Sequence, residues 1–178
     1  MEYFDFYLIH AVTADFYDLY QRCRSFEIVQ DLKRQGRVRH VGVSFHDQPE
    51  LLERVLTEHP EIEVVQLQFN YADYEAPAIR SRANYEAAEK HGKPVFVMEP
   101  VKGGGLVNLP DESKRILDAL NGGSYASYAI RYAASFPNVA VVLSGMGSMA
   151  MMEDNLSFMR DFKPLTPTEL EAVEPQTS

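Results

Sequence analysis

The sequence predicts an α/β fold built on a parallel sheet. Short apolar segments alternate along the chain with segments whose apolar residues recur at helical spacing. The apolar segments contain few polar positions, as expected of parallel strands that are covered on both faces. Small-residue turns follow the fourth and fifth apolar segments, and a (β/α)8 barrel binds phosphate groups after its last two strands. We therefore expect about five parallel strands with helices, arranged as an incomplete (β/α)8 TIM-type barrel.

The first predicted strand covers residues 1–10 and ends on His10. Its aromatic and aliphatic residues are typical of a buried strand. An imidazole at the carboxyl end of a strand is held at one edge of the sheet, where it can donate a proton or a hydrogen bond. A single histidine in such a place is more often structural, so its function depends on the surrounding motif.

The next segment, residues 11–24, is polar and aromatic without a clear period. We interpret it as a loop with one helical turn around residues 15–22. Apolar residues then recur at helical spacing over residues 26–35, and Gly36 after three polar residues ends this helix. The second predicted strand follows and ends on Ser44, as the first ends on His10.

Asp47 precedes Pro49 and Glu50, a pattern that predicts an N-cap and a helix as far as His59, where Pro60 stops it. The third predicted strand covers residues 64–70 and has amide side chains near its end. A helix then runs from about Pro77 to residue 92.

The fourth predicted strand, residues 94–98, leads into the turn 99–106. Two helices follow over residues 111–120 and 124–135. The remaining elements are the fifth strand (139–143), the turn 144–148, a helix over 149–159, and a last short helix that begins at a capping box formed by Thr166 and Glu169, with Pro167 at its first position.

The length of the chain bounds its organisation. With 178 residues, 46% of them hydrophobic, we expect a single domain over residues 1–178. A doubly wound sheet is the competing architecture, but its glycine-rich turn normally follows the first strand. A closed barrel needs eight βα units and roughly 250 residues. We therefore expect strands 4 to 8 of a barrel, with the first three units missing. An open sheet leaves unpaired edges, so we also expect self-association through exposed sheet edges or a longer protein.

The composition excludes several classes of partner. A net charge of −9 argues against nucleic acid and anionic membranes. The single cysteine, Cys23, cannot form an intrachain disulfide or an iron–sulfur cluster by itself. The histidines share no ligand spacing, so we expect no metal site, and we interpret His40, His46, His59 and His91 as surface or packing residues. No apolar run is long enough to cross a membrane, and no leader follows Met1, so we expect a cytoplasmic protein.

Five segments, in order and at the right spacing, resemble the aldo/keto reductase family over nearly the whole chain. They are DFYLIH (5–10), GRVRHVGVS (36–44), QLQFNY (66–71), MEPVKGG (98–104), and SGM (144–146) with EDN (153–155). The wording SFHD at residues 44–47 is most similar to a bacterial branch that carries a C-terminal ferredoxin-like segment, which is absent here.

The resemblance implies a (β/α)8 barrel that binds NADP or NAD and transfers a hydride to or from a carbonyl carbon. It also implies a catalytic tetrad of aspartate, tyrosine, lysine and histidine, of which this chain contains only the histidine, as His10. The other three belong to the missing units. We therefore expect NAD(P)H-dependent carbonyl reduction in the complete protein and no activity of this chain alone.

The resemblance also assigns cofactor contacts. Ser44 and Gln66 correspond to the residues that bind the nicotinamide carboxamide, and Phe45 stands where the family usually has asparagine. Met98 corresponds to the side chain under the nicotinamide ring. The backbone of the glycine turn would approach the pyrophosphate of the cofactor. Residues 144–148, which precede a helix, would bind an anionic group through free N–H groups. The expected contacts are Ser44, Gln66, Met98, Glu99, Val101, Lys102, Gly103, Gly104, Gly105, Leu106, Ser144, Gly145, Met146, Ser148, Asp154 and Asn155.

Three points stay open at this stage. The preference between NAD and NADP is undecided, because the stretch after the fifth strand offers Gly145, Met146 and Met151 where NADP-dependent relatives have basic side chains. The chain could instead be a non-catalytic, cofactor-binding or self-associating module derived from the barrel. In a third interpretation it is a complete reductase whose proton donor is one of Tyr3, Tyr7, Tyr71 and Tyr74.

Overall fold

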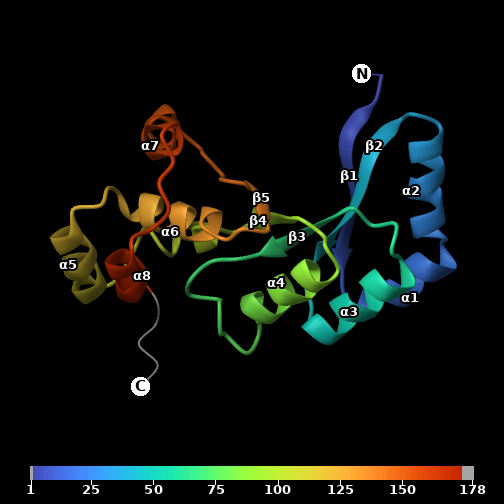
Figure 1. Cartoon of the computed structure of the whole chain (residues 1–178), viewed down its shortest axis with the longest axis horizontal. Coiled ribbons are helices and arrows are strands. Elements are labelled where there is room, and N and C mark those ends of the chain that lie inside the picture. Colours follow the sequence, from blue (N-terminus) through green and yellow to red (C-terminus); the bar gives the residue numbers. More distant parts are fainter. Residues whose placement is uncertain (1, 174–178) are drawn as a thin grey trace.

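The computed structural model describes residues 2–173, in which five strands form one parallel sheet. The strands are paired in the order in which they occur in the sequence, β1-β2-β3-β4-β5 (Figure 1). Their bounds are β1 (Phe4–Val12), β2 (Val38–Phe45), β3 (Val64–Gln68), β4 (Val95–Met98) and β5 (Val139–Val142). The prediction of five parallel strands alternating with helices is confirmed.

The helices lie along and around this sheet. α1, α2 and α3 are close to β1 and β2, whereas α5, α6 and α8 gather at the opposite end of the molecule (Figure 1). Their bounds are α1 (Ala14–Arg22), α2 (Ser25–Arg34), α3 (Pro49–Glu58), α4 (Ser81–Lys90), the short 3-10 helix η1 (Lys102–Gly104), α5 (Asp111–Leu120), α6 (Tyr125–Ala134), α7 (Met149–Met159) and α8 (Pro167–Val173).

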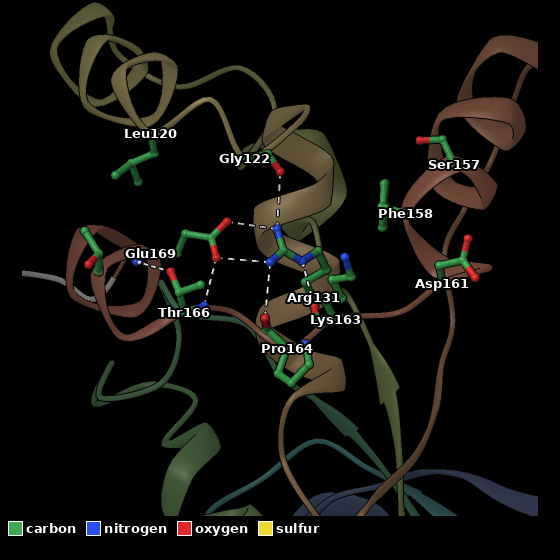
Figure 2. Close-up of a pocket in the computed structure, with 11 residues that line it drawn as sticks. Leu120, Gly122, Arg131, Ser157, Phe158, Asp161, Lys163, Pro164, Thr166 and Glu169 are labelled. Atoms are coloured by element: carbon green, nitrogen blue, oxygen red, sulfur yellow. Dashed lines mark hydrogen bonds and ion pairs between the residues drawn. The ribbon is translucent and has the colours of Figure 1, made fainter.

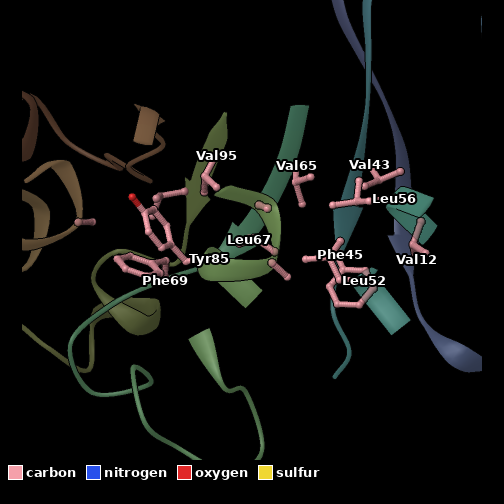
Figure 3. Packing of buried hydrophobic residues seen from close by; sticks show 14 of the residues in the cluster. Val12, Val43, Phe45, Leu52, Leu56, Val65, Leu67, Phe69, Tyr85 and Val95 are labelled. Atoms are coloured by element: carbon pink, nitrogen blue, oxygen red, sulfur yellow. The ribbon is translucent and has the colours of Figure 1, made fainter. Parts of the chain in front are cut away.

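The hydrophobic core lies between the helices and one face of the sheet. Alternate residues of a strand point to the same face, and those that point toward the helices are almost completely buried. Leu52 and Leu56 of α3 and Tyr85 of α4 pack in this layer (Figure 3). The strand residues of this face include Ile9, Val43, Phe45, Val65, Leu67, Val95 and Val97.

The other face of the sheet is curved and partly open. The rings of Phe6 on β1 and Phe96 on β4 are in edge contact, with centroids 5.0 Å apart. Three strand spacings of about 4.8 Å would hold β1 and β4 roughly 14 Å apart in a flat sheet. The contact therefore shows strong curling, as in a segment of a barrel wall. The sheet does not close, and Phe6 and Val141 remain 48% and 38% exposed.

Close packing on this curved face requires glycine at position 42. A Cβ atom built on Gly42 would lie 2.5 Å from Leu8 Cδ2, Val64 Cγ1 and the Val64 carbonyl oxygen. Gly42 thus lets the neighbouring side chains meet over the β2 backbone.

Three expectations about local structure were wrong. Residues 14–22 are a nine-residue helix rather than a loop with one turn. The reason is tertiary, because Tyr17 is buried and its hydroxyl donates to Glu58 Oε2 of α3 at 2.7 Å. β1 does not end on His10, since Ala11 forms an irregularity with φ 50° and Val12 pairs with Phe45.

The third wrong expectation concerns two helix starts. Asp47 does not cap α3, whose N-cap is Gln48 without a side-chain hydrogen bond. The carboxylate of Asp47 instead accepts a hydrogen bond from the N–H of Ala14 at 2.7 Å, and so satisfies a free donor at the start of α1. α4 begins at Ser81 rather than near Pro77, because Arg80 is left-handed with φ 51°.

The capping box of the last helix is present as predicted. Glu169 Oε2 accepts from the N–H of Thr166 at 2.8 Å, and the N–H of Glu169 donates to Thr166 Oγ1 at 3.3 Å. The same carboxylate forms a buried, bidentate ion pair with Arg131 of α6, at 3.0 and 3.1 Å (Figure 2). This pair attaches α8 to α6 beside a cavity of about 650 Å³.

Candidate functional site

Four side chains from four adjacent strands lie at the carboxyl edge of the open face. They are His10, Ser44, Gln66 and Met98, from β1 to β4 in that order. The pairing register places Ser44 beside Gln66, and Gln66 Nε2 lies 3.3 Å from Met98 Sδ. His10 is exposed, whereas Ser44 is buried. The parallel sheet thus brings the strand-end residues into one row.

His46 also belongs to this row, and its side chain is exposed, as expected of a surface residue. Its Nε2 lies 3.1 Å from Ser44 Oγ, within hydrogen-bond distance. Partial burial and then the neighbouring imidazole of His10 lower the pKa of His46 below its ordinary value. The only signal in the sequence for this contact is that His46 lies two residues after Ser44. Alternate residues of an extended segment point to the same face of a sheet.

A buried carboxylate that the sequence analysis missed organises the loops behind the row. Asp73 is 2% exposed and accepts hydrogen bonds from Gln68 Nε2 and Asn70 Nδ2, both at 2.8 Å. It also accepts from the ammonium group of Lys102. Burial raises the pKa of Asp73, but the hydrogen bonds from Lys102, Gln68 and Asn70 outweigh this effect and lower it overall. Asn70 and Asp73, three residues apart after a strand, are the signal that could have indicated this turn.

The glycine turn after β4 is tightly folded on itself. Gly103 and Gly104 have φ of 58° and 92°, which glycine adopts without strain. The N–H groups of Gly104 and Leu106 donate to the carbonyl of Val101 at 3.0 and 3.1 Å. Leu106 is a buried core residue rather than a surface of the turn.

A groove of about 900 Å³ lies between this turn, the loop after β5, and helices α6 and α7. Its volume is within the range of small-molecule sites, roughly 300–1,000 Å³. The predicted contacts that line it are Glu99, Val101, Gly103, Gly104, Ser144, Gly145, Met146, Asp154 and Asn155. Those that do not line it are Ser44, Gln66, Met98, Lys102, Gly105, Leu106 and Ser148. Because Glu99 follows Met98 directly, the groove adjoins the row of strand-end residues.

Hydrogen bonds between distant segments hold the far wall of the groove. Asn155 Nδ2 donates to Ser144 Oγ at 2.8 Å and ties α7 to the loop after β5. Ser124 Oγ donates to Asp154 Oδ2 at 2.6 Å and ties α7 to the start of α6. Ser148 Oγ accepts from the N–H of Met151 at 3.2 Å, so Ser148 is the N-cap of α7.

The tyrosines proposed as alternative proton donors have separate environments. Tyr71 is buried, and burial raises its pKa to about 12. Tyr3 lies under the guanidinium group of Arg39, whose Cζ is 3.9 Å from the ring centroid. Burial therefore opposes ionisation of the Tyr71 hydroxyl.

No group of three or more His, Cys, Asp or Glu side chains in the range 2–173 is placed to hold a metal ion. None of the helices in the range combines the length and apolar character needed to cross a bilayer.

Both the sequence and the fold are similar to those of known proteins. The sequence profile described as the aldo/keto reductase family matches residues 1–175. No curated protein matches the sequence significantly. The fold is similar to that of an aldo-keto reductase from Bacillus halodurans in its holo form, with a TM-score of 0.77 and 23% identity over 97% of this chain and 58% of that one.

Two further structures agree with this result. A thermostable aldo-keto reductase in complex with the inhibitor epalrestat has a TM-score of 0.77 and 24% identity, covering 98% of this chain and 60% of that one. An aldo/keto reductase from Klebsiella pneumoniae in complex with NADP and acetate has a TM-score of 0.74 and 19% identity, covering 100% and 62%. The chain therefore spans about three fifths of the length of these structures.

Proposed function

Because this chain belongs to the aldo/keto reductase family, we propose that it supplies the cofactor-binding part of an NAD(P)H-dependent carbonyl reductase. The observation that carries the proposal is the continuity between the strand-end row and the groove. Met98, whose Sδ contacts Gln66, is followed in the chain by Glu99, which lines the groove. An extended ligand can therefore pass from the open face of the sheet into the groove.

The residues of this path fit the parts of a nicotinamide dinucleotide. We assign the nicotinamide to Ser44, Gln66 and Met98, because an amide, a hydroxyl and a thioether can bind a carboxamide and pack on a ring. We assign the pyrophosphate to the backbone around Gly103 and Gly104, because neither residue has a side chain of its own to hinder a close approach. The adenosine end then lies along the wall built by α7.

His10 is the residue that we assign to catalysis. The cofactor, when bound, supplies the hydride for a carbonyl carbon. The exposed imidazole of His10 donates a hydrogen bond to the carbonyl oxygen, where negative charge develops as the carbon accepts hydride. His46 and Ser44 beside it hold the polar end of the row in place.

We propose that carbonyl reduction belongs to a longer protein in which three further βα units close the barrel. The supporting observations are the unclosed curved sheet and the relatives' greater length. The tetrad partners of His10 would come from those units. We also propose a cytoplasmic location, with which the exposed, free thiol of Cys23 is compatible.

A second candidate function is a self-associating module that keeps the cofactor groove. The observation that favours it is the edge strand β1, where Phe4, Phe6 and Tyr7 are 41–51% exposed. Exposed aromatic edges of this kind are covered in most native proteins by another strand or chain.

Cofactor binding can be tested by calorimetric titration of the chain with NAD⁺ and NADP⁺. Gly145 lines the groove and no atom lies within 4 Å of its Cβ position, so Gly145→Trp introduces an indole ring at the groove. Gly147 has the same free space in the same loop but does not line the groove, so Gly147→Trp is the matched control. We expect saturable binding that G145W abolishes and G147W retains. The absence of saturable binding of either dinucleotide to the unmodified chain would refute the proposal.

A further inference from the structure

The wall of the groove carries negative charge. Glu99, Asp118 and Asp154 contribute carboxylates, and no Lys, Arg or His side chain is among the described residues that line it. We propose that the groove selects the nicotinamide dinucleotide with a free 2′-hydroxyl on its adenosine ribose, NAD, and discriminates against the 2′-phosphorylated form, NADP. This inference rests on the proposed function and names the ligand of the same site.

Two of these carboxylates are held in place by the first turn of α6. Ser124 Oγ donates to Asp154 Oδ2 at 2.6 Å, and the hydroxyl of Tyr125 donates to Asp118 Oδ1 at 2.9 Å. A fixed carboxylate accepts hydrogen bonds from ribose hydroxyls. The same group repels a phosphate monoester, which carries up to two negative charges at neutral pH.

Lys102, the cation that we expected among the cofactor contacts, is already paired. Lys102 adjoins the lining residues Val101 and Gly103 in the sequence, but its ammonium group donates to the buried carboxylate of Asp73. Moving it to a phosphate would leave Asp73, which is 2% exposed, without its counterion. The loop after β5 adds only serine, glycine and methionine side chains between residues 144 and 149.

The expected discrimination is moderate, because Glu99 and Asp118 are exposed to solvent. Glu99 Oε2 lies 3.8 Å from the Cβ position of Gly103, beside the pyrophosphate that both dinucleotides share, so Glu99 does not affect the ratio. Single exposed charge pairs contribute about 0.2–1 kcal/mol, so the two carboxylates of Asp118 and Asp154 together give roughly a tenfold difference in affinity. Salt screens such interactions, so the difference is expected to decrease as the ionic strength increases.

The test is a calorimetric comparison of NAD⁺ and NADP⁺ binding at low and high salt. We expect NAD⁺ to bind roughly tenfold more tightly at low salt and the ratio to decrease at high salt. Equal or tighter binding of NADP⁺ overturns this inference and leaves the proposed function intact. Binding of neither dinucleotide refutes the proposed function itself, so the two failures are distinguishable.

A charge-introducing pair of variants sharpens the test. Met151 lines the groove and is 55% exposed, so Met151→Arg places a guanidinium group at the wall. Met152, on the same helix and 39% exposed, does not line the groove and provides the control Met152→Arg. We expect M151R to shift the affinity ratio toward NADP⁺ by about tenfold and M152R to leave it nearly unchanged. Equal shifts in both variants would show a general effect of net charge and overturn the inference.

Discussion

The ammonium group of Lys102 donates a hydrogen bond to the buried carboxylate of Asp73, and this contact joins the turn after β4 to the loop after β3. Asn70 reinforces the connection, since its Nδ2 also donates to the carbonyl oxygen of Glu99 at 3.0 Å. Lys102 therefore acts first as a structural cation, which positions the glycine turn at the mouth of the groove.

Removing this carboxylate should destabilise the fold. Asp73→Ala leaves the amides of Gln68 and Asn70 and the ammonium group of Lys102 without their shared acceptor. We expect a decrease of about 2–4 kcal/mol in the free energy of unfolding, measured by urea denaturation. Asp111→Ala, at a side chain that is 89% exposed, is the control and should change it by less than about 0.5 kcal/mol. Equal effects of the two substitutions would contradict the structural role.

The buried ion pair between α6 and α8 gives a second prediction. All five N–H groups of Arg131 are engaged, by both oxygens of Glu169 and by the carbonyls of Gly122, Lys163 and Pro164 (Figure 2). Arg131→Met leaves a buried carboxylate unpaired and should cost about 3–5 kcal/mol in thermal or urea unfolding.

The control for this prediction is a double mutant. Arg131→Met with Glu169→Leu removes both charges, and we expect it to be more stable than Arg131→Met alone because no buried charge remains unpaired. A double mutant with a lower free energy of unfolding than R131M would contradict this explanation.

Acidic pH should destabilise the chain partly through Glu63. Burial alone would raise the pKa of Glu63, but hydrogen bonds from Lys33, from the N–H of Val41 and from His40 lower it to about 2. A carboxyl group with a lower pKa in the folded state stabilises the fold above its unfolded pKa, and this contribution is lost as the pH falls. The loss therefore lies between about pH 4.5 and pH 2.

Urea unfolding at several pH values in this window measures the effect. Glu63→Gln should be less stable than the unmodified chain at neutral pH and should show a weaker dependence on pH below 4.5. Glu86→Gln, at an exposed position of α4, is the control and should retain the full dependence. The same dependence in E63Q and the unmodified chain would exclude Glu63 as the source.

The chain alone should not reduce carbonyl compounds. Only His10 of the tetrad implied by the family is present, and Tyr71, the buried candidate among the alternative donors, has a pKa of about 12. We expect no oxidation of NADH or NADPH above background with a generic aldehyde. Steady turnover that His10→Ala abolishes would show that this chain is catalytically complete.

The exposed edge of β1 should drive self-association when nothing else covers it. Phe4 is 51% exposed on this edge strand, and Ile28 is 52% exposed on a helix, α2, rather than on the edge strand itself. In sedimentation experiments, Phe4→Lys should shift the chain toward monomer, because a charged edge disfavours strand pairing. Ile28→Lys should leave the association unchanged. An unmodified chain that is monomeric over the whole concentration range would contradict this prediction.

The sequence alone was sufficient for the architecture, because the features that determine it are local. Apolar segments, helical periodicity and punctuation by glycine and proline placed the five strands close to their observed bounds, and the capping box at Thr166 and Glu169 was found where its pattern predicts. The sequence also predicted that His10, Ser44, Gln66 and Met98 lie at one edge of the sheet, because the carboxyl ends of parallel strands lie at the same edge.

Only the tertiary structure decided which polar groups remain available for a ligand. The length of α1, the pairing of Lys102 with Asp73, the contact of His46 with Ser44 and the attachment of Asp154 to Ser124 all join residues whose partners are set by folding. Sequence patterns report spacing along one strand or helix, whereas these contacts depend on the curvature of the sheet and on how distant loops meet. The charge of the groove therefore became visible only when its walls, which come from segments far apart in the chain, were assembled.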